Sequence, residues 1–141
     1  MKIVVAVDGS AYTRKALDYL VAHRAQFVEG NELVLVNVCA AIPPHASRHI
    51  SKELLNEYYS DESAKVLEPV KAQLSELGVS NYSIQSRHGS AAAEIVAAAK
   101  EVNAGLIVMG TRGHGTLGRA LMGSVATNVI ADAGMSVLLV Q

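Results

Sequence analysis

The stretch "KIVVAVDGS", from Lys2 to Ser10, decides the fold class of this chain. After its lysine it is a continuous apolar run rich in β-branched residues, the pattern of a strand that is buried on both faces of a sheet. The run stops at Asp8 and Gly9, and the apolar residues that follow recur at helical spacing over residues 13–26. We therefore predict a buried strand that is followed at once by a helix.

The same alternation continues along the chain. Apolar runs predict further strands at residues 32–38, 105–110 and 136–140. Residues 81–86 alternate weakly between apolar and polar side chains and predict an edge strand. Helical spacing recurs between them, at residues 52–77, after the candidate cap Ser90 and at residues 125–133, whereas residues 40–51 predict a loop. This pattern indicates a single α/β domain over residues 1–141, doubly wound, with a five-stranded parallel sheet and helices on both faces.

Unusual residues follow two of the expected strands. Asp8, Gly9 and Ser10 come after the first strand, and the segment "GTRGHG" from Gly110 comes after the fourth. In doubly wound sheets the ligand lies beyond the carboxyl ends of the strands, where the strand order reverses. If both segments serve one ligand, strands one and four are neighbours, which predicts the order 3-2-1-4-5.

Composition excludes several classes of protein. Half of the residues are apolar, 18% are charged and the formal net charge is -1, so we expect no partner among nucleic acids or anionic membranes. No apolar run reaches the ~18 residues of a membrane span and the N-terminus does not resemble a signal peptide, which predicts a cytoplasmic location. The single Cys39 suits a reducing compartment. His45 and His49 lack a third ligand nearby, so no metal site is expected.

The segment "GTRGHGTLGRALMGS", Gly110 to Ser124, is much longer than the ~2 to 6 residues that usually join a strand to a helix. Two familiar phosphate-binding patterns fit it poorly. The dinucleotide pattern at Gly113, Gly115 and Gly118 lacks the acidic residue expected ~20 positions later. A P-loop would need lysine and then serine or threonine after Gly118, where Arg119 and alanine stand.

A third spacing has a complete physical rationale: Gly110, two residues, Gly113, nine residues, then Gly123 and Ser124. The first two glycines permit close approach of backbone N–H groups to phosphate oxygens and allow positive φ in a turn. The last pair stands at the start of a helix, where free N–H groups and the helix dipole favour an anion. Both ends of the segment are therefore candidates for holding one phosphate group. Interactions with phosphate and simple solvation both remain open for Arg112, His114 and Arg119.

The stretch "IVMGTRGHGTLGRALMGSVA", residues 107–126, is very similar to the closing motif of the ATP-binding members of the universal stress protein family, G-x2-G-x9-G-(S/T). "KIVVAVDGS" and "LVLVNV", residues 33–38, resemble two other landmarks of that family. The resemblance implies homodimerisation through the final strand and binding of ATP, which Mg²⁺ is expected to accompany. The site residues that it implies near the adenosine are Asp8 and Val38, and those around the ribose and phosphates are Gly110, Gly113, Gly123 and Ser124.

The sequence therefore favours an ATP-binding protein that acts as a nucleotide-dependent switch or factor in the stress response. No catalytic residue is assigned, because no base and charge clamp for phosphoryl transfer can be identified, and slow hydrolysis stays open. Two alternatives remain: an adenine-nucleotide hydrolase or adenylyl-transferring enzyme of a related α/β fold, and an interaction module without nucleotide.

Overall fold

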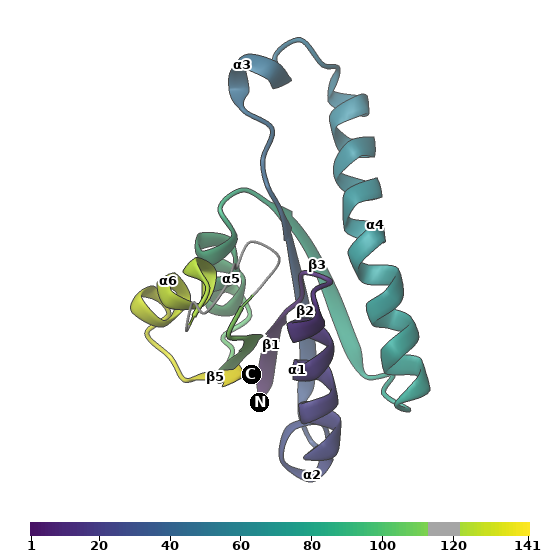
Figure 1. The fold of residues 1–141 in the computed structure, drawn as a ribbon, viewed down its shortest axis with the longest axis vertical. Helices are drawn as coiled ribbons and strands as arrows, with labels where there is room; N and C mark the ends of the chain where they lie inside the picture. The colour runs from purple at the N-terminus through teal and green to yellow at the C-terminus, as the bar shows by residue number, and fades with distance from the viewer. Residues whose placement is uncertain (113–121) are drawn as a thin grey trace.

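The computed structural model describes residues 1–112 and 122–141, and these form a five-stranded parallel sheet in the order β3-β2-β1-β4-β5 (Figure 1). The strands are β1 (Lys2–Ala6), β2 (Glu32–Cys39), β3 (Tyr82–His88), β4 (Leu106–Gly110) and β5 (Val137–Val140). All four pairings are parallel. The predicted order 3-2-1-4-5 is thereby confirmed.

Helices cover both faces of the sheet, as a doubly wound fold requires. The helices are α1 (Ala11–Ala22), α2 (Arg24–Phe27), α3 (Pro44–Ser47), α4 (Lys52–Glu76), α5 (Ala91–Glu101) and α6 (Ser124–Asp132). Side chains alternate along β1: Ile3 and Val5 pack in the core beneath α1 and α4, while Val4 packs in the core beneath α5 and α6. Because a strand buried on both faces has no polar side, its sequence is the continuous apolar run seen at the N-terminus.

The first helix differs from the expected 13–26 at both ends. It begins at Ala11 because Ser10 caps it, with the Ser10 hydroxyl accepting a hydrogen bond from the Thr13 backbone N–H at 3.4 Å. It breaks at His23, whose φ of -114° is not helical, so the last residues form the separate turn α2. The expected loop at 40–51 likewise contains one helical turn, α3, with Pro44 at its first position, where a missing N–H costs nothing.

Two further helix ends show how glycine and serine cap these helices. Gly78 closes α4 with a φ of +73°, as expected of a glycine in the left-handed region. Ser90 does stand at the N-cap of α5, but its side chain makes no capping hydrogen bond to the described residues. Its contribution comes instead from the backbone, because the Ser90 carbonyl accepts from the Glu94 N–H at 2.9 Å. The predicted N-cap position of Ser90 is therefore confirmed, without a hydrogen bond from its side chain to the described residues.

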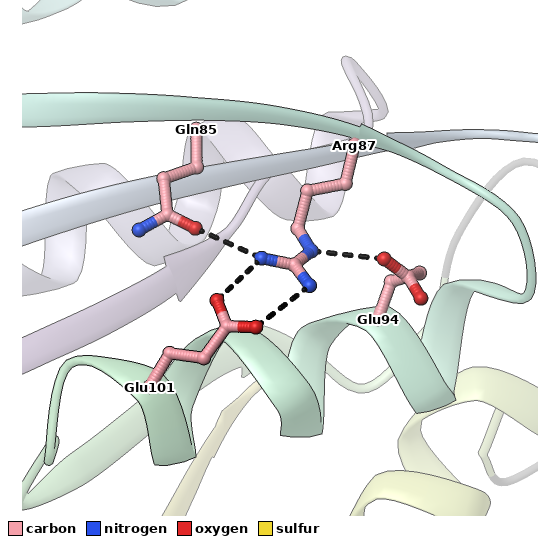
Figure 2. A network of polar contacts seen from close by, with 4 residues as sticks. All are labelled: Gln85, Arg87, Glu94 and Glu101. Atoms are coloured by element: carbon pink, nitrogen blue, oxygen red, sulfur yellow. Dashed lines mark hydrogen bonds and ion pairs between the residues drawn. The ribbon is translucent and has the colours of Figure 1, made fainter.

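The edge strand β3 is fastened to α5 by one arginine (Figure 2). Arg87 Nε donates to Glu94 at 2.9 Å, and its two terminal nitrogens donate to the Glu101 carboxylate at 2.8 and 3.3 Å. Gln85 accepts a further bond from Arg87 at 3.2 Å. The hydrogen bond from Arg87, and then its charge, lowers the pKa of Glu101, and the same contacts raise the pKa of Arg87. Arg87 thus joins strand and helix through a two-pronged pair.

Removing this arginine is expected to make stability less dependent on pH in the acid range. Arg87→Met should lower the free energy of unfolding by about 1 kcal/mol at neutral pH, because two carboxylates lose their donor. The depressed pKa of Glu101 stabilises the fold above the unfolded value of about 4.3, and this contribution is lost as the pH falls through the lower folded pKa. Urea unfolding at pH 7 and below pH 3 measures the difference. An equal loss at both pH values would contradict the assignment.

Candidate functional site

The strand order reverses between β1 and β4, whose parallel pairing brings the carboxyl ends of the two strands side by side. Val5 is level with Val108 of β4 and with Leu35 of β2. Continued for two or three residues, this register sets Val7 beside Gly110 and Asp8 beside Val38. The Val7 backbone N–H donates to the Val36 carbonyl at 2.9 Å, so the pairing of β1 and β2 does extend past the end of β1. Asp8, Val38 and Gly110 therefore share one edge of the sheet.

Asp8 is fixed by the turn that leads from β1 into α1. Its Oδ1 accepts hydrogen bonds from the Ser10 N–H at 2.9 Å and from the Thr13 hydroxyl at 2.7 Å. The Thr13 hydroxyl in turn accepts from the Asp8 N–H at 3.0 Å. Gly9 takes a φ of +78°, which a side chain would disfavour. Asp8 thus orders the turn, while Ser10 caps the helix.

Gly110 is needed for close packing against α1. A Cβ at this position would lie 2.5 Å from the Cβ of Tyr12 and 3.2 Å from the carbonyl oxygen of Arg112. The distance to Tyr12 is shorter than real Cβ atoms show, the distance to Arg112 is tighter than most real Cβ contacts, and neither atom is the end of a flexible side chain. The sequence predicted a glycine that brings backbone near a ligand or turns with positive φ. Gly110 has no positive φ, and the observed requirement is its contact with Tyr12.

The two ends of the glycine segment are joined to each other. The Thr111 N–H donates to the Val140 carbonyl at 3.0 Å, and the Thr111 carbonyl accepts from the Gly123 N–H at 2.7 Å. Gly123 therefore lies next to the end of β4, where Gly110 is the last residue of the strand. Gly113 lies outside the described residues, as do His114 and Arg119.

Ser124 is the first residue of α6, directly after the N-cap Gly123. No side chain among the described residues caps this helix, and its first turn holds no acidic residue. The Gly123 carbonyl accepts from the Thr127 N–H at 3.1 Å and from the Thr127 hydroxyl at 3.0 Å. The leading N–H groups of a nine-residue helix and the positive end of its dipole suit an anion at this end.

Other side chains that brace this edge could not be identified from the sequence. Buried Asn37 donates through Nδ2 to the Val7 carbonyl at 3.0 Å and holds β1 to β2 beyond the last ladder pair. The Tyr59 hydroxyl accepts from the Ile42 N–H at 3.0 Å, and the Tyr59 ring stacks on His88 with centroids 4.3 Å apart. The only sequence signal for Asn37 is that it is a polar residue within an apolar run.

Among the residues that the structure describes, no group of three His, Cys, Asp or Glu side chains is placed to hold a metal ion. Of the helices in those ranges, none combines the length and the apolar character that crossing a membrane requires.

A parallel sheet whose strand order reverses between β1 and β4 places the chain in the class of doubly wound α/β proteins. The family follows from comparison with known sequences. A sequence model of the universal stress protein family matches residues 1–141, and the chain belongs to this family.

The relatives span the chain almost completely. A universal stress protein of Methanocaldococcus jannaschii is 36% identical over 99% of this chain and 81% of its own length. The universal stress protein YxiE of Bacillus subtilis is 34% identical over 99% of this chain and 98% of its own length. Among solved structures, the universal stress protein UspA of Lactobacillus plantarum superposes with a TM-score of 0.79 at 21% identity, covering 100% of this chain and 97% of that one.

Proposed function

We propose that this chain binds ATP, with Mg²⁺ on its phosphates, at the carboxyl edge between β1 and β4. One observation carries the proposal: Asp8, Gly110 and the start of α6 meet at the edge where the strand order reverses. A carboxylate lies on one side, and on the other lie the leading N–H groups of α6, which no side chain of the described residues caps. These groups match a molecule with hydroxyl groups at one end and phosphates at the other.

Solved structures with the same fold support adenine nucleotides as the ligand class. They include a universal stress protein in complex with cAMP and one from Archaeoglobus fulgidus in complex with dAMP, with TM-scores of 0.67 and 0.69. A family member from Arabidopsis thaliana has AMP bound. These proteins are 19 to 23% identical to this chain, so the residue assignments below rest on this chain's own geometry and on the family motif.

Each predicted site residue has a proposed role. Asp8 and the backbone of Val38 contact the adenosine. Gly110, Gly113, Gly123 and Ser124 surround the ribose and the phosphates. With no cluster of carboxylates among the described residues, Mg²⁺ is held mainly by phosphate oxygens and water, as Mg²⁺ commonly is.

We further propose a cytoplasmic homodimer that acts as a nucleotide-dependent switch or factor in the stress response. Dimerisation through β5 is supported by its place at the edge of the sheet, with Val137, Leu138 and Leu139 only half-buried. An unpaired apolar edge strand is an aggregation liability that a partner strand would remove. A nucleotide-dependent role does not require rapid hydrolysis of ATP, and the sequence offers no identifiable base and charge clamp for phosphoryl transfer.

The role of Asp8 can be tested without disturbing the turn. In Asp8→Asn the amide oxygen can still accept from Ser10 and Thr13, while the negative charge of the side chain is lost. We expect adenosine and ATP each to bind about ten-fold more weakly, because a hydrogen bond to a charged group is lost. Calorimetric titration measures both affinities, with Asp132→Asn at the far end of α6 as the matched control. Unchanged affinities would restrict Asp8 to holding the turn.

A further inference from the structure

Tyr12 occupies a fixed position beside the candidate site. It lies in the first turn of α1 and is half-buried. A methyl group added to Gly110 would lie 2.5 Å from the Cβ of Tyr12 and 3.3 Å from its carbonyl carbon. The start of the Tyr12 side chain is therefore set by a main-chain contact between α1 and the end of β4.

Two cations meet this tyrosine from different parts of the chain. Lys15 Nζ lies 5.1 Å from the centroid of the Tyr12 ring, within the range of a cation–π interaction. The Arg112 guanidinium reaches the Tyr12 hydroxyl, with Nη1 to oxygen at 3.5 Å, a long hydrogen bond. Arg112 belongs to the glycine segment, just two residues beyond Gly110.

Neither cation has a carboxylate partner in the described part of the chain, where all ion pairs involve other residues. The remaining segment, residues 113–121, contains no aspartate or glutamate that could supply one. Since the whole chain has a formal net charge of -1, this is a local excess of positive charge rather than general basicity. Such an excess beside a candidate phosphate site attracts an anion with several charges.

We propose that Lys15 and Arg112, held together by Tyr12, make this site prefer nucleotides with a triphosphate over those with a single phosphate. The inference rests on the proposed function, because it concerns the same edge of the sheet. Gly110 and the start of α6 bind the part of the nucleotide nearest the ribose. The tyrosine-bound cations interact with the additional phosphates, and Tyr12 acts as a positioning residue for both.

The test compares four probes, each in the presence of Mg²⁺: ATP, AMP, adenosine and inorganic tripolyphosphate. Wild type is expected to bind ATP at least about ten-fold more tightly than AMP. Lys15→Gln and Arg112→Gln should each weaken ATP and tripolyphosphate about five-fold, the size of one partly exposed charge interaction, and leave adenosine unchanged. Raising the salt concentration should reduce the wild-type preference, because exposed charges are screened.

Tyr12→Phe separates positioning from direct binding. It keeps the ring beneath Lys15 and removes the hydroxyl that Arg112 contacts. Its ATP affinity should therefore fall about as far as that of Arg112→Gln, and adding Tyr12→Phe to Arg112→Gln should have little further effect. The matched control is Arg14→Gln, which removes one positive charge from an exposed position next to Lys15 on another face of α1. It should alter none of the four affinities.

The outcomes separate this inference from the proposed function. If adenosine and AMP bind wild type as tightly as ATP, the site binds adenine nucleotides and the charge preference is wrong. If tripolyphosphate binds and adenosine does not, the proposed role of Lys15 and Arg112 is supported and the proposed adenine site is wrong. An equal effect of Arg14→Gln, or equal losses for adenosine and ATP in the Lys15 and Arg112 variants, would also reject the inference. Binding of none of the probes would reject both.

Discussion

Gly110→Ala is expected to lower the free energy of unfolding by about 2 to 3 kcal/mol, the upper range for overpacking. The new methyl group would lie 2.5 Å from the Cβ of Tyr12 and 3.2 Å from the backbone oxygen of Arg112. Neither atom can move without displacing α1 or the chain after β4. Rotation of a side chain therefore cannot relieve the clash, and the backbone is strained instead. The loss should be seen in urea or thermal unfolding without any ligand present.

Two further variants make this prediction specific. Gly105→Ala is the matched control, because the nearest atoms to its methyl group belong to the Met1 side chain, with Sδ at 2.6 Å, and this side chain can rotate away at a cost under about 1 kcal/mol. The double variant Gly110→Ala with Tyr12→Gly removes the opposing Cβ. Its loss of unfolding free energy should therefore be smaller than the sum of the losses in the two single variants. If Gly110→Ala is as stable as Gly105→Ala, the packing reason for this glycine is wrong.

Gly123→Asp is expected to separate stability from ligand binding. Gly123 is the N-cap of α6 with a φ of -72° and a ψ of 161°, a conformation open to any residue. Aspartate is a favoured N-cap and suits the helix dipole, so the free energy of unfolding should rise by about 0.5 kcal/mol. The same carboxylate would occupy the N–H groups proposed for phosphate and repel its charge. ATP should therefore bind at least about 100-fold more weakly.

The neutral variant Gly123→Ser supplies the comparison. It can cap the helix with a hydroxyl and adds no charge, so it should keep much of the gain in stability and lose far less affinity. Thermal unfolding and calorimetric titration of the three proteins provide both quantities. Undiminished ATP binding by Gly123→Asp would show that phosphates do not bind at the start of α6.

Sequence patterns were sufficient for the fold because β1, β2 and β4 are nearly continuous apolar runs, as expected of strands in a parallel sheet that is covered on both faces. The inference that Asp8 and Gly110 share an edge predicted that β1 and β4 are neighbours, and the sheet order confirms it. The structure adds that the Gly123 N–H donates to the Thr111 carbonyl beside the end of β4.

Features that depend on distances between elements were not predictable. Nothing near Tyr12 in the sequence indicates that its Cβ packs on Gly110, or that it gathers Lys15 and Arg112. The break after α1 at His23 interrupts a helical pattern that continues through it. Such details arise when packed surfaces meet, and a one-dimensional pattern contains no measure of those contacts.

The most direct test of the central claim is calorimetric titration of the wild-type chain with ATP and Mg²⁺. Before titration, the purified protein is denatured, any released nucleotide is identified by chromatography, and the refolded chain is used free of ligand. The account predicts saturable binding of one ATP per chain, with loss of binding in Gly123→Asp and little turnover of ATP by the protein alone. Turnover of many equivalents per minute would favour the enzyme alternative. No binding at millimolar ATP would contradict the account and favour an interaction module without nucleotide.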